Sequence, residues 1–234
     1  MDAVTTATPA DAAPLTPQQY GVGARLTLSV YDSDYVRIIL DALESADATG
    51  LDIDTGDIST FVGGPERRIV GYVREVIAAA AASGAHVSAS VLLSRGCPGE
   101  LQCELPAGTT ALGADDVSLA PSGVRARAHW SLYPLLDADH GTDHGGESGG
   151  EADHMAAIGR AIDHARETGV YDGSDHYATR LDGDLSAVLE TAANAWIAVG
   201  RTVQHVTTHL TISLNSPTSI RPTLSGPPAA GAGR

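Results

Sequence analysis

Residues 86–94 read HVSASVLLS, and residues 205–213 read HVTTHLTIS. Both stretches largely alternate apolar and polar side chains, a pattern typical of a β-strand with one buried face. The second stretch lies 119 residues after the first (205 minus 86). The same offset relates TGLD (49–52) to TGVY (168–171), and ISTFVGG (58–64) to YATRLDG (177–183). One offset shared by three separate blocks indicates an internal duplication.

A second offset locates an insertion. ARLTLSVY (24–31) aligns with ARAHWSLY (126–133), which lies 102 residues later (126 minus 24). The offset therefore grows by 17 (119 minus 102), and DADHGTDHGGESGGEAD (137–153) has that length. We expect this segment to be inserted into the second copy.

The duplication sets the expected domain organisation. The first repeat spans 21–98 and the second spans 123–218, with the insertion inside it. Residues 99–122 are rich in Gly, Pro and Asp, so they are the expected linker. Residues 1–20 and 219–234 lack periodicity and are expected to be disordered tails.

Each copy predicts the same order of elements. The first strand alternates, and the apolar residues of two later segments recur at helical spacing, as with Ile38 and Ala42 or Ile158 and Ile162. Two short strands lie between these helices. The order βαββαβ predicts the α+β class, with two tandem ferredoxin-like repeats whose antiparallel sheets carry helices on one face.

The alternation also predicts which side chains lie on the sheet face that the helices leave bare. They are hydroxyls, imidazoles and tyrosines: Thr27, Ser29, Tyr31, His86, Ser88, Ser90 and Ser94 in the first copy, and His129, Ser131, Tyr133, His205, Thr207, His209, Thr211 and Ser213 in the second. A solvated face usually carries Lys, Glu and Arg, so this composition favours a covered polar surface. Two interpretations stay open, a ligand pocket in each repeat or a sheet-to-sheet interface without ligand. Either needs another layer, so the two repeats, or two chains, should pack together.

Composition excludes several classes of protein. The chain of 234 residues has a formal net charge of −15, which argues against binding to nucleic acid or to an anionic membrane surface. No apolar stretch approaches the length of a membrane helix, and the N-terminal residues do not resemble a secretory signal. We therefore expect a cytoplasmic protein. The sequence has no Gly-rich phosphate loop, no G-x-S-x-G and no H-E-x-x-H, so we expect no enzyme activity and no cofactor.

Several segments resemble the YkoF-like proteins. They are SVYDSDYVRIILDAL (29–43), DISTFVGG (57–64), GAHVSASVLLSRGCPG (84–99), GVYDGSDHYATRLDGDLSAVLE (169–190) and NSPT (215–218). The resemblance covers residues 21–219. It implies duplicated ferredoxin-like modules that form homodimers and bind thiamine or hydroxymethylpyrimidine, one molecule per repeat. It also implies a role in uptake or salvage of the thiamine precursor, with a transport system as an expected partner.

A pyrimidine needs a flat slot with apolar or aromatic walls and a few hydrogen-bonding groups. The candidate ligand contacts are Tyr31 and Tyr133 as walls, Ser29, Ser88, Ser131, Thr60 and Thr179 as hydrogen-bonding groups, and His86, His176 and His205 at the pocket. Asp175-His176-Tyr177 aligns with Gly56-Asp57-Ile58, so we expect the two sites to differ in affinity.

Three alternatives stay open. The chain could be an enzyme that uses His176 with Asp175 on a related heterocycle. It could also be a regulatory or assembly module without a small ligand. The insertion carries His140 and His144 among several acidic residues, a composition that could chelate a transition metal; we expect a flexible, solvated loop instead.

Overall fold

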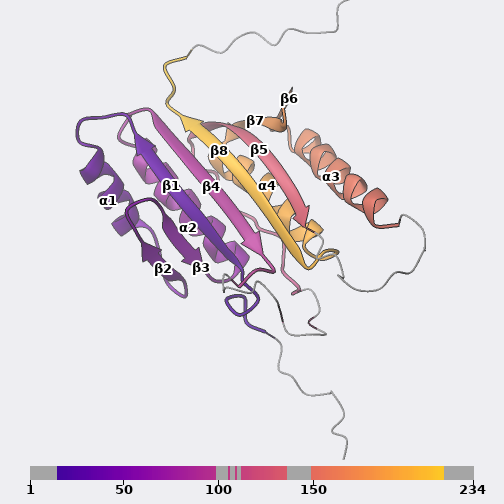
Figure 1. Cartoon of the computed structure of the whole chain (residues 1–234). Coiled ribbons are helices and arrows are strands. Elements are labelled where there is room, and N and C mark those ends of the chain that lie inside the picture. The colour runs from indigo at the N-terminus through magenta and orange to yellow at the C-terminus, as the bar shows by residue number, and fades with distance from the viewer. Residues whose placement is uncertain (1–14, 99–104, 106–108, 110–111, 136–148, 219–234) are drawn as a thin grey trace, which may run out of the picture.

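The computed structural model describes residues 15–98, 105, 109, 112–135 and 149–218, with side chains in the last range from residue 158 onward. Its elements are β1 Gly23–Val30, α1 Tyr35–Ser45, β2 Asp52–Thr55, β3 Thr60–Gly63, α2 Glu66–Ala81, β4 Val87–Arg95, β5 Arg125–Leu135, α3 Gly149–Glu167, β6 Tyr171–Asp175, β7 Ala178–Asp184, α4 Leu185–Val199 and β8 His205–Leu214. The order βαββαβ occurs twice, which confirms the predicted α+β fold of two tandem repeats (Figure 1).

The two repeats share one sheet. Its eight strands follow the order β2-β3-β1-β4-β8-β5-β7-β6, and every neighbouring pair is antiparallel. The repeats meet where β4 pairs with β8, and Val91 lies opposite Leu210 in that register. These two residues are 119 positions apart, so each is the repeat equivalent of the other. A local twofold relation between the repeats therefore passes through the middle of the sheet.

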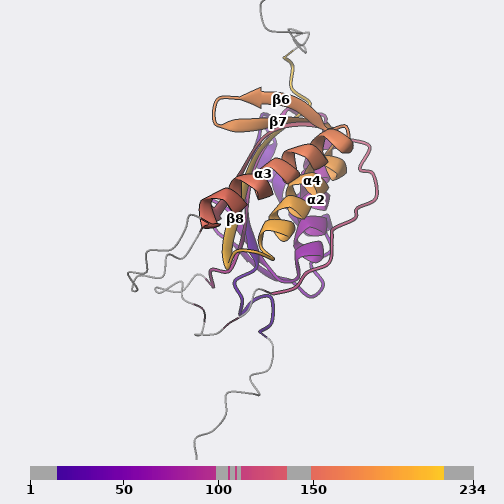
Figure 2. The ribbon, with the colours of Figure 1, turned by 90° about the vertical axis from the view of Figure 1, so that its right-hand side faces the viewer.

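The helices form a single layer on one face of this sheet (Figures 1 and 2). The central helices α2 and α4 pack against each other and bury most of their apolar side chains, among them Ile69, Ile77, Leu189 and Trp196. Burial of this apolar surface is the main stabilising term of the fold. None of the described helices combines the length and the hydropathy that crossing a bilayer would need.

The opposite face is left open by the described part of the chain (Figure 2). The predicted alternation is correct here, because Ser88 and Ser90 are half-buried on this face while Val87 and Ala89 are buried on the other. We expected the two repeats or two chains to supply a covering layer. The repeats instead join edge to edge, since backbone hydrogen bonds between β4 and β8 satisfy both strands. Within one chain, neither repeat covers the other.

The element boundaries differ from the expected ones at three places. Residues 15–20 fall within the expected N-terminal tail, yet Tyr20 is buried and its hydroxyl donates to the carbonyl of Gln204 at 2.9 Å. Part of the expected linker packs on α4, because Val117 exchanges hydrogen bonds with the Asn194 side chain at 2.7 and 3.0 Å. Helix α3 begins at Gly149, inside the segment assigned to the insertion.

The first repeat buries an ion pair. Arg95 at the end of β4 is fully buried, and its guanidinium lies 3.5 Å from Glu66 of α2. The same group lies 3.4 Å from the Ile197 carbonyl of the second repeat and about 6 Å from the Trp196 ring. Burial lowers the pKa of Arg95, and the Glu66 carboxylate opposes that effect. The ion pair therefore links α2 and β4 of the first repeat to α4 of the second.

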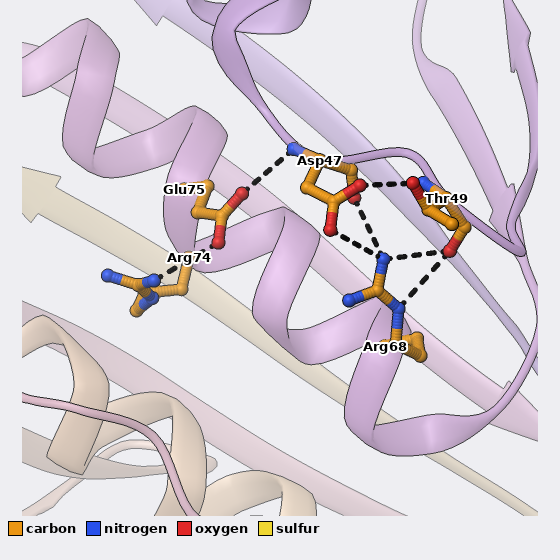
Figure 3. A network of polar contacts seen from close by, with 5 residues as sticks. All are labelled: Asp47, Thr49, Arg68, Arg74 and Glu75. Carbon is orange, nitrogen blue, oxygen red and sulfur yellow. Dashed lines mark hydrogen bonds and ion pairs between the residues drawn. The ribbon is translucent and has the colours of Figure 1, made fainter.

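A second polar network holds the connection between α1 and β2 (Figure 3). Arg68 donates to the Asp47 carboxylate at 3.0 Å and to the Thr49 carbonyl at 2.7 Å. Glu75 accepts from the backbone N–H of Asp47 at 2.9 Å. These contacts tie the end of α1 to α2, and α1 forms one wall of the cavity described next.

Candidate functional site

Each repeat contains a cavity between its first helix and the tip of its short β-hairpin. In the second repeat the cavity has a volume of about 330 Å³ and lies among α3, the end of β5 and the β6–β7 hairpin. In the first repeat it has a volume of about 140 Å³ and lies among α1, β1 and the β2–β3 hairpin. The two cavities therefore occupy the same place in two copies of one fold.

Residue equivalence supports this correspondence. Eight lining positions match at the offsets of 102 or 119: Leu28 with Trp130, Ile39 with Ile158, Leu43 with Ile162, Thr55 with Ser174, Gly56 with Asp175, Ile58 with Tyr177, Ser59 with Ala178, and Thr60 with Thr179. Most pairs keep the same chemical type. The helix supplies aliphatic groups, and the hairpin supplies small hydroxyl-bearing residues.

The hydroxyl groups differ in how they are engaged. In the first cavity Thr60 is buried, and its Oγ1 lies at 3.1 Å from Oγ1 of Thr55. In the second cavity Ser174 is in hydrogen-bond contact with the Tyr171 hydroxyl at 3.3 Å, and Thr179 has no side-chain hydrogen bond among the described residues. The hydroxyl of Thr179 is therefore the more accessible of the two threonine hydroxyls for a ligand.

Each hairpin tip is anchored to the first strand of its repeat. Thr27 Oγ1 donates to the Ile58 carbonyl at 3.3 Å, and Ser131 Oγ donates to the Tyr177 carbonyl at 3.1 Å. Tyr177 has φ of 64°, and its side chain is completely exposed. A left-handed backbone conformation is uncommon for a residue other than glycine. The Ser131 contact helps to hold this conformation and thereby keeps the Tyr177 ring at the rim of the second cavity.

Asp175 contributes a negative charge to the second cavity. Its Oδ1 accepts from the backbone N–H of His176 at 2.8 Å, and its Oδ2 lies 3.7 Å from Nε2 of His129. The His176 N–H is the largest cause of a lowered pKa for this carboxyl; desolvation opposes it and His129 adds to it. Asp175 is therefore ionised over the physiological pH range.

Four of the ten candidate ligand contacts line the cavities. Thr60 lines the first cavity, and Ser131, Tyr133 and Thr179 line the second. Thr60 and Thr179 pair with Leu26 and Trp130 across neighbouring strands, so both lie on the helix side of the sheet. The structure thus brings Ser131, Tyr133 and Thr179 to one cavity, while Ser131 and Tyr133 also pair with His209 and Thr207 of β8, as the bare-face pattern predicts.

The other six candidates do not line either cavity. Ser29, Tyr31, His86, Ser88 and His205 belong to the open face, and His176 lies on the β6–β7 hairpin. The ring of Tyr31 stacks on His86 at 4.8 Å, and Nε2 of His86 is in hydrogen-bond contact with Ser213 at 3.1 Å. These contacts give the open-face groups partners within the protein. The backbone N–H of His176 donates to the Asp175 carboxylate. This contact does not involve the imidazole, whereas the enzyme alternative needs an imidazole–carboxylate pair.

Sequence reasoning did not single out the helix residues of the cavities. Helical spacing predicts core positions for Ile158 and Ile162, and likewise for Ile39 and Leu43 of the first repeat. They are only half-buried in the structure, since the cavity lies beside them. Ile39 and Leu43 lie 119 residues before Ile158 and Ile162, the same offset that relates Thr60 to Thr179. This shared offset is the sequence signal that points to these helix residues.

The metal alternative falls outside the described residues. His140 and His144 lie in the undescribed range 136–148, so their arrangement is not tested. Within the described residues, no group of three or more His, Cys, Asp or Glu side chains is placed to hold a metal ion.

Comparison with known proteins gives two matches. The model of the YKOF-related family matches residues 21–100 and 149–219, which include β1–β4 and α3–β8. The Bacillus subtilis (strain 168) protein named "Putative HMP/thiamine-binding protein YkoF" is 28% identical over 200 residues, covering 83% of this chain and 90% of that protein. The family model matches well over half of the chain, and the residues it matches include the helix and hairpin walls of both cavities. The chain therefore belongs to the YKOF-related family.

Proposed function

We propose that this protein binds thiamine or its hydroxymethylpyrimidine half reversibly, with one site in each repeat and without chemical conversion. The pair of repeat-equivalent cavities is the observation that carries the proposal. The name of the Bacillus subtilis relative supports the choice of ligand. Family membership supports the repeat of one site rather than two unrelated cavities.

The lining suits an aminopyrimidine. The ring is flat and apolar on its faces, while its nitrogens and exocyclic amine need hydrogen-bond partners. In the second cavity Trp130, Ile158 and Ile162 offer apolar walls. Thr179 and Ser174 offer hydroxyls that can donate or accept. Small-molecule sites usually combine these two features.

The two sites should bind with unequal affinity. Ligand pockets usually measure about 300–1,000 Å³. The second cavity reaches this range with about 330 Å³, whereas the first has about 140 Å³ and must widen to admit a ligand. That widening has an energetic cost, so the second repeat should hold the tighter site.

We also propose a homodimer that forms through the open face of the sheet. In the central strands β1, β4, β8 and β5 the open-face positions carry hydroxyls, histidines, tyrosine and arginines together with the exposed Leu92 and Leu135, and none carries Asp, Glu or Lys. In a chain with a net charge of −15, a face without acidic groups lowers the repulsion between two copies. Sedimentation equilibrium should give twice the chain mass; a monomer at micromolar concentration would contradict this part.

The biological role we propose is uptake or salvage of a thiamine precursor in the cytoplasm, together with a transport system. Isothermal titration calorimetry with thiamine and with hydroxymethylpyrimidine tests the binding itself. We expect saturable binding of two molecules per chain and recovery of the unchanged compound after long incubation. Absence of binding for both compounds would overturn the proposal, and a converted product would replace it with an enzyme.

A further inference from the structure

The two cavities carry the same sign of charge. Among the described lining residues, the charged side chain of the first cavity is Asp57, and that of the second is Asp175. The remaining described lining residues are apolar or bear neutral hydroxyls, and none is Lys, Arg or His. A positive group on a ligand would therefore meet a carboxylate in either cavity, whereas a negative group would meet no described counter-charge.

The two aspartates do not occupy equivalent positions. At the offset of 119, Asp57 aligns with His176, and Asp175 aligns with Gly56. The hairpin sequences have thus diverged, yet each hairpin places one carboxylate at its cavity. The two sites therefore share a negative charge but not the position that carries it. Such a shared charge is expected if the ligand requires a negative group at the cavity.

The surroundings of Asp175 leave its charge available. Its nearest cationic side chain is His129, at 3.7 Å, which is charged only when protonated. The charge of Arg180 also lowers the pKa of Asp175, but its hydrogen bonds go to the Asp172 carbonyl at 2.5 and 3.2 Å, and it lies 3.5 Å from the Asp172 carboxylate. The Asp175 side chain is 44% exposed, so a ligand can reach it while solvent screening moderates the attraction.

We infer that both cavities select ligands that carry a positive charge, and that thiamine is therefore preferred to hydroxymethylpyrimidine. Thiamine carries a permanently cationic thiazolium ring, whereas hydroxymethylpyrimidine is neutral at physiological pH. Thiamine monophosphate adds a negative group and should bind less tightly than thiamine. This inference rests on the proposed function and identifies which of its two ligands the sites are built for.

The second cavity should show the stronger preference. Tyr133 and Tyr177 line it, whereas the equivalent of Tyr177 in the first cavity is Ile58. An aromatic face near a cation adds a favourable electrostatic contact. Aromatic rim and carboxylate therefore act in the same direction in the second repeat.

The test is calorimetric titration of the full chain with thiamine, hydroxymethylpyrimidine and thiamine monophosphate. The variant D57N/D175N removes the carboxylate of each cavity and keeps the size of the side chain. The matched control D54N/D115N removes two exposed carboxylates, one on β2 and one on the segment before β5, at positions that do not line the cavities. Both variants change the net charge equally, so the control separates a local contact from the overall field of the protein.

We expect the wild type to bind thiamine more tightly than the other two compounds. D57N/D175N should weaken thiamine binding about two- to fivefold and leave hydroxymethylpyrimidine binding nearly unchanged. D54N/D115N should resemble the wild type. The inference is overturned if D57N/D175N weakens both compounds equally or neither, or if the control weakens thiamine as much. A wild type that binds neither compound would instead overturn the proposed function.

Discussion

The two repeats have one fold but differ in what lies at equivalent positions. The first repeat buries the ion pair of Glu66 and Arg95, whereas the second has Leu185 and Leu214 at those positions, both buried. The first repeat encloses the smaller cavity and the second the larger one. The same framework thus tolerates either a polar or an apolar pair in its core. We therefore expect core substitutions to act mainly on the first repeat, and the proposed ligand site of the second repeat to be the tighter one.

The largest expected effect comes from breaking the buried pair. R95L leaves the Glu66 carboxylate buried without its counter-charge, so we expect a loss of about 3–5 kcal/mol in the free energy of unfolding. E66L/R95L installs the leucine pair of the second repeat and should recover part of that loss. Urea unfolding followed by the fluorescence of Trp130 and Trp196 measures both. If the change in the free energy of unfolding for E66L/R95L equalled the sum of the changes for E66L and for R95L, the two side chains would not be coupled, which would contradict this prediction.

The next largest effect separates the two cavities. Ile162 and Leu43 are equivalent helix residues that line the second and first cavities. I162W and L43W should each fill one cavity, and since overpacking costs about 1–3 kcal/mol, affinity at that site should fall by up to about a hundredfold. We expect I162W to remove the tighter site and L43W the weaker one. Calorimetric stoichiometry should fall from two to one in each variant, and an unchanged value of two would contradict the assignment of the sites.

Much of the fold could be predicted from the sequence, because a duplication leaves a constant offset and strands leave an alternation. The pairing of β4 with β8 could not, since backbone hydrogen bonds between strands have no side-chain signature. A weaker signal existed: residues 87–94 contain no charge and no proline, whereas exposed edge strands usually carry such residues. That absence favours a strand with a neighbour on both sides.

The candidate sites were only partly predictable. Alternation assigns Ser29 and Ser88 to the open face correctly, but a cavity depends on the spacing between a helix and a hairpin tip. That spacing is a property of packing, which the sequence pattern does not encode. Thr60 and Thr179 were found because they are repeat-equivalent hydroxyls. The sequence indicates Asp175 only as a neighbour of His176, because the position of its carboxylate at the cavity depends on the folded hairpin.

A smaller effect on ligand affinity is expected from substituting the two equivalent threonines, Thr60 and Thr179. In the first cavity Thr60 Oγ1 contacts Thr55 Oγ1 at 3.1 Å, so a ligand must compete with this partner. Since one hydrogen bond contributes about 1 kcal/mol, T179V should weaken hydroxymethylpyrimidine binding about fivefold, and T60V only about twofold. Titration in the L43W and I162W backgrounds isolates each site. A larger loss for T60V than for T179V would reverse the comparison.

The smallest effect concerns the network around Asp47, which only the first repeat has, because Arg68 aligns with Ala187 of the second (Figure 3). Hydrogen bonds from Thr49, and then from Arg68, lower the pKa of Asp47 from 3.8 to about 2. A carboxyl with a depressed folded-state pKa stabilises the fold above its unfolded pKa, and the contribution disappears as pH falls through the folded value. The Tm of the wild type should therefore exceed that of D47N by at most about 2 °C at pH 6. This difference should shrink as the pH falls from 3.8 towards 2. Thermal unfolding followed by circular dichroism measures this Tm difference. If the difference stayed constant down to pH 2, the charge of Asp47 would not be what stabilises the connection between α1 and β2.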